Sequence, residues 1–209
     1  ENLKQYEKDV DLFDIATLKK SFVAKTDDFF REDRKLNIGI IGRVKAGKST
    51  FLNSLLFEGK SILPTAVTPK TAALTRIEYG ETNKLEVEYY SKFEWANLKK
   101  SAAEGSNKND TVVAKEIMKL VADSGIQAEE YIARGTDTKE YDSYDEMKED
   151  LNQYIGENGK ITPLVKCVTI YVNNEDLEEI SVVDTPGLYD PVVSRVDRTR
   201  HFIELCDVV

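Results

Sequence analysis

The chain has 209 residues, of which 41% are hydrophobic and 32% charged, with a formal net charge of −9. These values predict one sizeable core with an appendage, and no apolar run approaches the roughly 20 residues of a membrane-spanning helix. The first residues lack a signal peptide's basic start and apolar middle, so we expect a soluble intracellular protein. The acidic balance argues against a broad nucleic-acid surface.

The first half of the chain predicts helices, then a strand, a glycine loop and a helix. Apolar residues recur at helical spacing through residues 1–35. The apolar run at 36–41 suits a strand buried on both faces of a parallel sheet. Ser49–Phe57 is predicted to be a helix that ends near Gly59. Its inward-facing residues are expected to be Phe51, Leu52, Leu55 and Leu56.

The second half predicts further strands around a helical insertion. Ala73–Tyr79 and Lys84–Tyr90 have strand character, and Val165–Val172 and Ile180–Val183 return to it. Between them, about residues 91–163, we expect roughly 70 residues of helical insertion. One of its helices should bury Met147, Leu151 and Ile155, begin at the capping box Ser143-x-x-Glu146 and end at Gly156. Val208-Val209 resembles the opening of another strand, so we expect the chain to be a fragment.

The motif Gly42-x-x-x-x-Gly47-Lys48-Ser49 matches the P-loop pattern. In this pattern backbone N–H groups wrap the phosphates, the Lys neutralises β/γ oxygens and the Ser hydroxyl ligates Mg²⁺. The motif also follows a predicted strand and opens a predicted helix, which is the context that phosphate binding at a helix N-terminus requires. The expected nucleotide-binding residues of this segment are Gly42, Arg43, Val44, Lys45, Ala46, Gly47, Lys48, Ser49 and Thr50.

A second signature, Asp184-Thr185-Pro186-Gly187, follows the strand Ile180–Val183. Alone, such a tetrapeptide would more often be a plain turn. Downstream of a P-loop it indicates the GTPase motif, in which the Asp holds Mg²⁺ through a water and the Gly N–H meets the γ-phosphate. Asp184 and Gly187 are therefore candidate nucleotide-site residues.

A switch segment between these motifs should supply a threonine that ligates Mg²⁺ and holds the attacking water. The loop 63–71 offers Thr65, Thr68 and Thr71. Thr68 is the preferred candidate because it is central and because Pro69 biases it to an extended conformation. Thr65 is the alternative. The predicted metal ligands are thus Ser49, Thr68 and Asp184, and the predicted fold class is an α/β P-loop NTPase, a Rossmann-like three-layer sheet.

Three stretches resemble the large GTPases of the bacterial dynamin-like group. They are GRVKAGKSTFLNSLL at 42–56, LPTAVTPKTA at 63–72 and DTPG at 184–187. The resemblance implies a cytoplasmic enzyme that hydrolyses GTP to GDP, dimerises across its nucleotide faces and associates peripherally with membrane lipids, which it remodels through regions outside these residues. Residues 1–35 would be a neck- or bundle-type helical segment and 36–209 the N-terminal portion of the GTPase domain. The base-reading motif N/T-K-x-D would come later, so guanine specificity rests on the resemblance.

Two positions depart from patterns expected for GTPases. Leu188 stands where small regulatory GTPases carry a water-orienting Gln, and an apolar side chain cannot hold that water. Val44-Lys45 stands where typical dynamins have Gln-Ser, whose Ser helps place a monovalent cation. Lys45 is either a built-in cation, similar to the Arg of the interferon-induced guanylate-binding GTPases, or a solvated loop lysine. Catalysis would then rest on Lys48, Thr68 and Lys45.

Several other residues fit ordinary structural roles. His201, on a predicted helix, is expected to be a surface or packing residue, and Trp95 a packing anchor of the insertion. Cys167 and Cys206 are expected to be buried small apolar residues.

The sequence leaves two alternatives to a membrane-remodelling GTPase. One is a translation- or ribosome-associated GTPase, which the −9 charge disfavours. The other is a nucleotide-binding regulatory scaffold with little turnover, which the missing Gln suggests.

Overall fold

The computed structural model describes residues 34–42, 46–64, 73–104, 109–156, 158–184 and 206–209, together with Lys19, Phe22, Val23 and Thr26. The chain divides into two compact units, Glu1–Lys35 and Leu36–Val209. In the first unit, Lys19, Phe22, Val23 and Thr26 are helical, and the Thr26 hydroxyl donates to the Phe22 carbonyl at 2.8 Å. The other residues of the predicted N-terminal helices lie outside the described residues, so the neck-type assignment stays a prediction.

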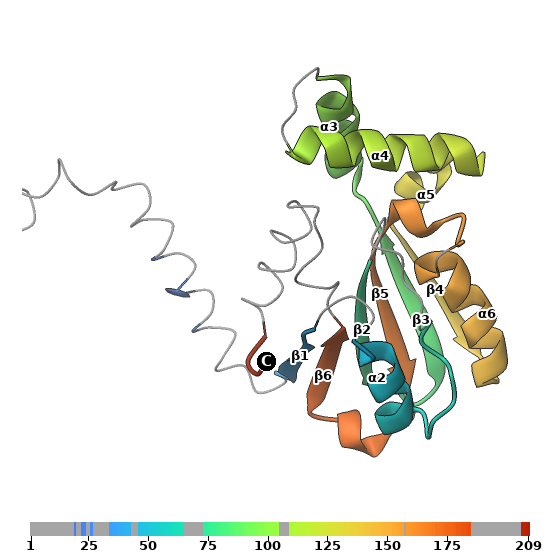
Figure 1. The fold of residues 1–209 in the computed structure, drawn as a ribbon. Coiled ribbons are helices and arrows are strands. Elements are labelled where there is room, and N and C mark those ends of the chain that lie inside the picture. The colour runs from blue at the N-terminus through green and yellow to red at the C-terminus, as the bar shows by residue number, and fades with distance from the viewer. Residues whose placement is uncertain are drawn as a thin grey trace, which may run out of the picture. The chain divides into compact units, whose positions relative to one another are not determined.

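Six strands of the second unit form one mixed sheet in the order β1-β6-β2-β5-β3-β4 (Figure 1). The strands are β1 Leu36–Ile40, β2 Leu74–Tyr79, β3 Asn83–Tyr89, β4 Thr136–Tyr141, β5 Val165–Val172 and β6 Ile180–Asp184. β1 runs parallel to β6, and β2 runs parallel to β5. The pairs β2–β6, β3–β4 and β3–β5 are antiparallel. The predicted α/β fold is confirmed, but its sheet is mixed.

β1 is less buried than its apolar sequence predicts. Gly39 is its one buried residue, and Leu36 is 38% exposed. β1 has a full neighbour, β6, along one edge, and an outer strand is covered less than a central one. The other edge is met by Val208, which forms a parallel bridge with Ile38 and accepts a hydrogen bond from the Gly39 N–H at 2.8 Å. The strand character expected of Val208 is thereby supported.

Helix α2, Lys48–Leu56, follows the P-loop and packs on the core with only part of its predicted face. Leu52 and Leu56 are buried, whereas Phe51 and Leu55 are 55% and 60% exposed. The prediction that all four point inward is wrong because neighbouring helical residues differ by about 100° in direction. The positions that share the inward face are Leu52, Asn53 and Leu56. The helix ends as predicted, where Gly59 adopts a φ of 80° and donates to the Asn53 carbonyl at 3.0 Å.

Helix α6, Tyr144–Ile155, covers the same face of the sheet as α2. It buries Met147, Leu151 and Ile155 as predicted, and the Ser143 hydroxyl accepts a hydrogen bond from the Glu146 N–H at 3.3 Å. The rings of Phe57 and Tyr144 meet edge to face at 5.9 Å, which joins the end of α2 to the start of α6. One hydrophobic cluster therefore runs from α2 across the sheet to α6.

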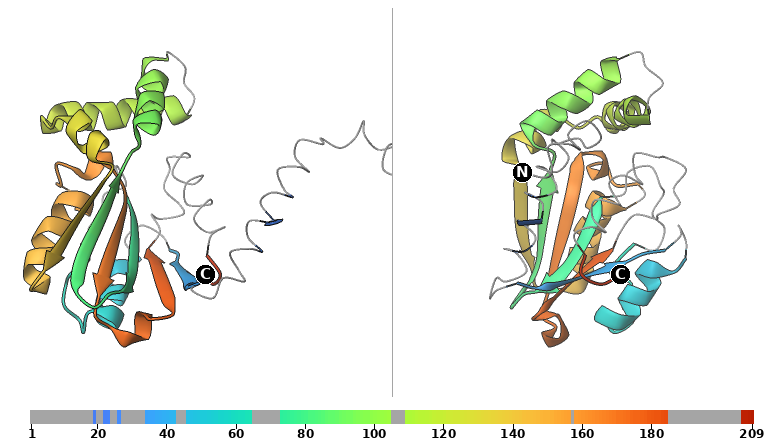
Figure 2. Two further views of the ribbon diagram at one scale, coloured as in Figure 1. Left: turned by 180° about the vertical axis from the view of Figure 1, so that it is seen from behind. Right: turned by 90° about the vertical axis from the view of Figure 1, so that its left-hand side faces the viewer.

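The insertion between β3 and β5 is helical only in part. Helices α3 Lys92–Ala103, α4 Asn109–Ser124 and α5 Ala128–Arg134 lie beyond one end of the sheet (Figures 1 and 2). Trp95 of α3 is 5% exposed and stacks on Tyr90 with ring centroids 6.3 Å apart, so its predicted packing role is confirmed. After α5 the chain returns as β4, a strand that the sequence prediction missed. Two short 3-10 helices, Thr162–Leu164 and Glu175–Leu177, flank β5.

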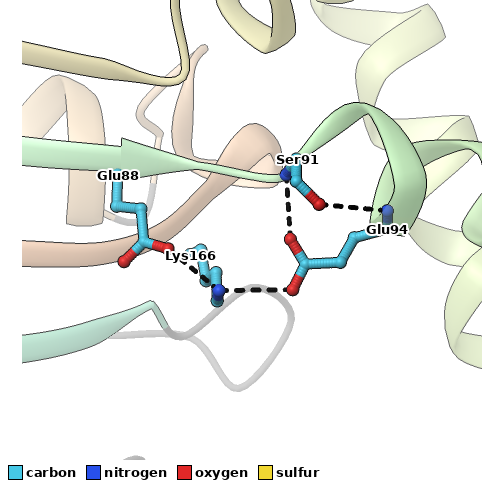
Figure 3. Close-up of polar contacts among 4 residues, drawn as sticks. All are labelled: Glu88, Ser91, Glu94 and Lys166. Atoms are coloured by element: carbon cyan, nitrogen blue, oxygen red, sulfur yellow. Dashed lines mark hydrogen bonds and ion pairs between the residues drawn. The ribbon is translucent and has the colours of Figure 1, made fainter.

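A polar network ties the first turn of α3 to the sheet (Figure 3). The Lys166 ammonium group contacts the carboxylates of Glu88 at 2.9 Å and Glu94 at 3.2 Å. Glu94 also accepts a hydrogen bond from the Ser91 N–H at 2.8 Å, and its own N–H donates to the Ser91 hydroxyl at 3.2 Å. Ser91 and Glu94 thus form a complete capping box, to which Lys166 adds a link from β5.

The two cysteines lie in or beside a smaller hydrophobic cluster with Leu74 and Val183. Cys167 is buried as predicted, whereas Cys206 is only partly buried, and the two do not form a disulfide. Within the ranges that the structure describes, no helix combines the length and apolar character needed to cross a membrane.

Candidate nucleotide site

The sheet brings the two sequence signatures to one of its ends. β1 and β6 run parallel, and Ile40 at the end of β1 lies opposite Asp184 at the end of β6. The P-loop leaves β1 just after this point, so Gly42 and Asp184 emerge from neighbouring strands. Loops that follow the carboxyl ends of adjacent strands form the ligand crevices of open α/β sheets.

The first turn of α2 has the features of a phosphate-binding helix N-terminus. Gly47 precedes the helix with φ 87° and ψ 13°, a left-handed conformation that glycine adopts without strain. No acidic side chain occupies the first turn. The first N–H groups of a helix and its positive dipole end suit an anion, and α2 carries no acidic side chain there to compete with one. Lys48 and Ser49 stand in this turn, as predicted.

Lys48 folds back over the start of its own loop. Its ammonium group donates to the Gly42 carbonyl at 3.4 Å. A β-carbon on Gly42 would lie 3.4 Å from the Lys48 side chain, at the limit of ordinary van der Waals contact, so the lysine packs directly beside this glycine. The lysine is thus held beside the loop by a weak, replaceable contact.

Asp184 is partly buried and has one buried carboxylate oxygen. Its Oδ1 has no hydrogen-bond partner among the residues that the structure describes. Burial raises the pKa of Asp184 from 3.8 to about 6, and the nearby positive charge of Lys48 partly opposes this rise. A buried carboxylate oxygen without a partner is unfavourable in itself, and a cation would relieve it.

These residues fit Mg²⁺ better than a metal held by protein ligands alone. No group of three or more His, Cys, Asp or Glu side chains suited to a metal occurs in the described ranges. Mg²⁺ commonly binds through one or two protein oxygens, with waters and nucleotide phosphates completing its shell. Asp184 and the Ser49 hydroxyl are oxygen donors of this kind.

Asn53 of α2 is a residue of this region that the sequence prediction missed. Its side chain is 4% exposed and makes three hydrogen bonds to the segment just before residues 65–72. The far end of residues 65–72 leads into β2, where Thr75 lies opposite Asp184. The chain before the predicted switch segment is therefore hydrogen-bonded to α2, and the chain after it enters a strand that pairs with β6 beside Asp184. An asparagine among the apolar residues of α2 was the signal available in the sequence.

Several predicted site residues lie outside the described residues. They are Arg43, Val44 and Lys45 of the P-loop, Thr65, Thr68 and Thr71 of the switch segment, and Gly187, Leu188 and His201. Among the described ones, Gly42 follows β1, and Ala46 and Gly47 precede α2. The first residues of α2 are Lys48, Ser49 and Thr50, and Asp184 ends β6.

Comparison with known families decides the relationship. The family model described as Dynamin family matches residues 38–209, which is most of the chain. The chain belongs to the dynamin family. The matched residues include Gly42–Ser49 and Asp184, so the two signatures of this dynamin-family chain fall within the shared domain.

Curated relatives and solved structures agree with this assignment. The chain is 32% identical to dynamin-like protein 1 of Campylobacter jejuni over 189 residues, which cover 90% of the chain but 24% of that relative. It is 44% identical over 50 residues to the bacterial dynamin-like protein of Nostoc punctiforme, covering 24% of this chain and 7% of that protein. A solved structure from an oligomerised bacterial dynamin pair, reported as a mechanism for long-range sensing and tethering of membranes, is 27% identical with a TM-score of 0.56. That match covers 92% of this chain and 29% of the other, so the chain spans only a part of its relatives.

Proposed function

We propose that this dynamin-family chain contributes the phosphate- and Mg²⁺-binding half of a GTP-hydrolysing domain. The observation that carries the proposal is the buried, unpartnered Oδ1 of Asp184, at the sheet end where α2 begins with Lys48 and Ser49. A carboxylate so placed needs a cation, and a helix N-terminus beside it suits the phosphates that would share that cation. The family membership supports GTP as the nucleotide.

In this proposal Lys48 neutralises β/γ-phosphate oxygens, and Mg²⁺ is held by Ser49, Thr68 and, through a water, Asp184. When bound, Mg²⁺ would supply positive charge that neutralises the phosphate oxygens. Gly42–Thr50 surrounds the phosphates, and Gly187 meets the γ-phosphate. Among the described residues the Lys48 ammonium group makes one hydrogen bond, at 3.4 Å to the Gly42 carbonyl, which phosphate oxygens could replace.

Thr68 and Lys45 complete the proposed catalytic group. Leu188 cannot orient water by hydrogen bonding, so the Thr68 carbonyl is proposed to hold the attacking water. Lys45 is proposed to stand near the charge that develops during phosphoryl transfer, which a monovalent cation stabilises in typical dynamins. A lysine there would act as a point charge because it lacks the fork of an arginine.

The proposed biological role is nucleotide-dependent remodelling of membranes by a self-associating, peripherally bound protein. Its support is the similarity to a bacterial dynamin pair that oligomerises and tethers membranes. Self-association is proposed to occur across the nucleotide face. Membrane contact is assigned to parts of the protein beyond these 209 residues.

The test uses the full-length protein with Mg·GTP, Mg·ATP and EDTA controls. Phosphate release from GTP should occur only with Mg²⁺ and should rise more than linearly with protein concentration. Lys48→Ala should abolish it, whereas Lys115→Ala, at an exposed position of α4, should leave it unchanged. Turnover of ATP but not GTP, or nucleotide binding with no release of phosphate, would overturn the proposal in favour of another NTPase or a regulatory scaffold.

A further inference from the structure

Asn53 uses its whole side-chain amide to hold one short piece of backbone. Its Oδ1 accepts from the N–H groups of Ile62 at 3.1 Å and Leu63 at 2.8 Å, and its Nδ2 donates to the Leu63 carbonyl at 3.0 Å. Ile62 and Leu63 are themselves buried. The Asn53 carbonyl also accepts from the N–H groups of Phe57 and Gly59. One residue therefore fixes both the end of α2 and the strip of chain that follows it.

This amide connects two parts of the proposed site. Asn53 lies one helical turn after Ser49 and on the same side of α2, because residues four apart are neighbours on a helix. Leu63, at the other end of its hydrogen bonds, comes immediately before the segment that contains Thr68. The described start of the predicted switch loop is therefore held by a residue of α2.

We propose that Asn53 is a positioning residue for GTP hydrolysis, which sets the starting point of the switch segment relative to the helix that carries Lys48 and Ser49. This inference rests on the proposed function. Asn53 touches no reacting atom in it and acts through Leu63. Nucleotide affinity would depend on the P-loop, and the rate of the chemical step would depend on Asn53 as well.

The chemistry of the side chain explains why other residues would not serve. Aspartate would accept the two N–H groups but would turn an oxygen toward the Leu63 carbonyl, where a donor is needed. Alanine would leave two N–H groups and one carbonyl buried without these partners. A displacement of the reacting groups by about 1 Å can lower a rate roughly 100-fold even when binding persists.

The test compares Asn53→Asp and Asn53→Ala with Thr162→Ala in the full-length protein. Thr162 is an apt control because it is also 4% exposed and its hydroxyl shares its one proton between two backbone carbonyls, those of Gln153 and Gly156, within the insertion. The measurements are GDP affinity, single-turnover hydrolysis at saturating Mg·GTP, and hydrogen exchange of the Ile62 and Leu63 amides, all below the unfolding temperature of each variant.

Both Asn53 variants should hydrolyse bound GTP about 10- to 100-fold more slowly. GDP affinity should change by less than about threefold. Amide exchange at Ile62 and Leu63 should accelerate, and Thr162→Ala should keep the wild-type rate. If Asn53→Ala does not fold, Asn53→Asp carries the test, since it retains two of the three hydrogen bonds. Wild-type hydrolysis by the Asn53 variants overturns this role alone, as does an equal loss in Thr162→Ala. A wild-type protein that does not hydrolyse GTP overturns this role and the proposed function together.

Discussion

Lys48 and Gly42 are joined by a hydrogen bond of 3.4 Å from the lysine ammonium group to the glycine carbonyl, across the P-loop motif. The same ammonium group lowers the pKa of Asp184, which burial has raised. The lysine, the loop and the carboxylate therefore form one electrostatic unit before any nucleotide arrives. Removing the charge of one member should therefore change the pKa of another.

Removing the charge of Lys48 should raise the pKa of Asp184 above its value of about 6. In Lys48→Met the burial of Asp184 persists, while the charge that favours its ionised form is gone. The pKa can be followed by NMR titration of the Asp184 carboxyl carbon without nucleotide. Lys60→Met, which changes a lysine beyond the other end of α2, should leave that pKa unchanged. A lower pKa in Lys48→Met would contradict the coupling.

Asp184→Asn should stabilise the nucleotide-free, metal-free protein at neutral pH. Because the folded-state pKa of Asp184 lies above its ordinary value of 3.8, the stability linked to its protonated form is complete below pH 3.8 and is lost as pH rises to about 6. Above pH 6 the buried charge opposes folding by up to about 3 kcal/mol. Asparagine carries no such charge.

The measurement for Asp184→Asn is the unfolding midpoint in EDTA between pH 4 and pH 8. The advantage of the variant should be absent near pH 4 and should grow until about pH 6. Asp123→Asn, at an exposed position of α4, serves as the control for a change in net charge. An Asp184→Asn variant less stable than wild type at pH 7.5 would show that the carboxylate has a partner of its own.

Lys45→Ala should slow GTP hydrolysis if the lysine supplies charge to the reaction. An arginine finger is worth roughly 10³- to 10⁵-fold in rate, and a lysine should supply less because it cannot fork. We expect single-turnover hydrolysis to fall by at least about 10-fold, with Lys45→Arg retaining activity. An unchanged rate in Lys45→Ala would make this residue a solvated loop lysine.

Ser91→Ala should weaken the junction between the sheet and α3. It removes the acceptor for the Glu94 N–H, and loss of an N-cap side chain costs about 1 kcal/mol. Lys166→Met should have a smaller effect, of at most about 1 kcal/mol and reduced by salt, because its partners are partly exposed. Thermal unfolding at low and high salt compares the two. The loss of stability in Ser91→Ala should not depend on salt. A larger loss that varies with salt in this variant would contradict the prediction.

The sequence predicted those parts of the fold and site in which residue type is tied to backbone shape. Gly47 must be glycine for its left-handed turn, and Asp184 follows a strand whose apolar run is unmistakable, so both could be placed from pattern alone. Met147 and Leu151 recur at helical spacing on a helix with a capping serine. Each of these features is local, and local signals survive in a single sequence.

Features set by distant contacts could not be predicted in the same way. β4 has the sequence Thr136-Asp-Thr-Lys-Glu-Tyr141, with no alternation of apolar residues, and it is a strand because β3 pairs with it. Phe51 and Leu55 looked like core because apolarity alone does not say which side of a helix the sheet covers. Asn53 is buried where its side chain binds the backbone of Leu63, ten residues away, and no spacing rule predicts such a hydrogen bond.

The stacking of Trp95 on Tyr90 gives the chain a built-in optical reporter. Trp95 is its one tryptophan, and it sits in α3 directly after the capping box that Lys166 joins to the sheet. Its emission should therefore be that of an indole shielded from water and should shift to longer wavelength when α3 separates from the sheet. Fluorescence during the nucleotide cycle would then reveal whether the insertion stays docked while the phosphate site changes its ligand.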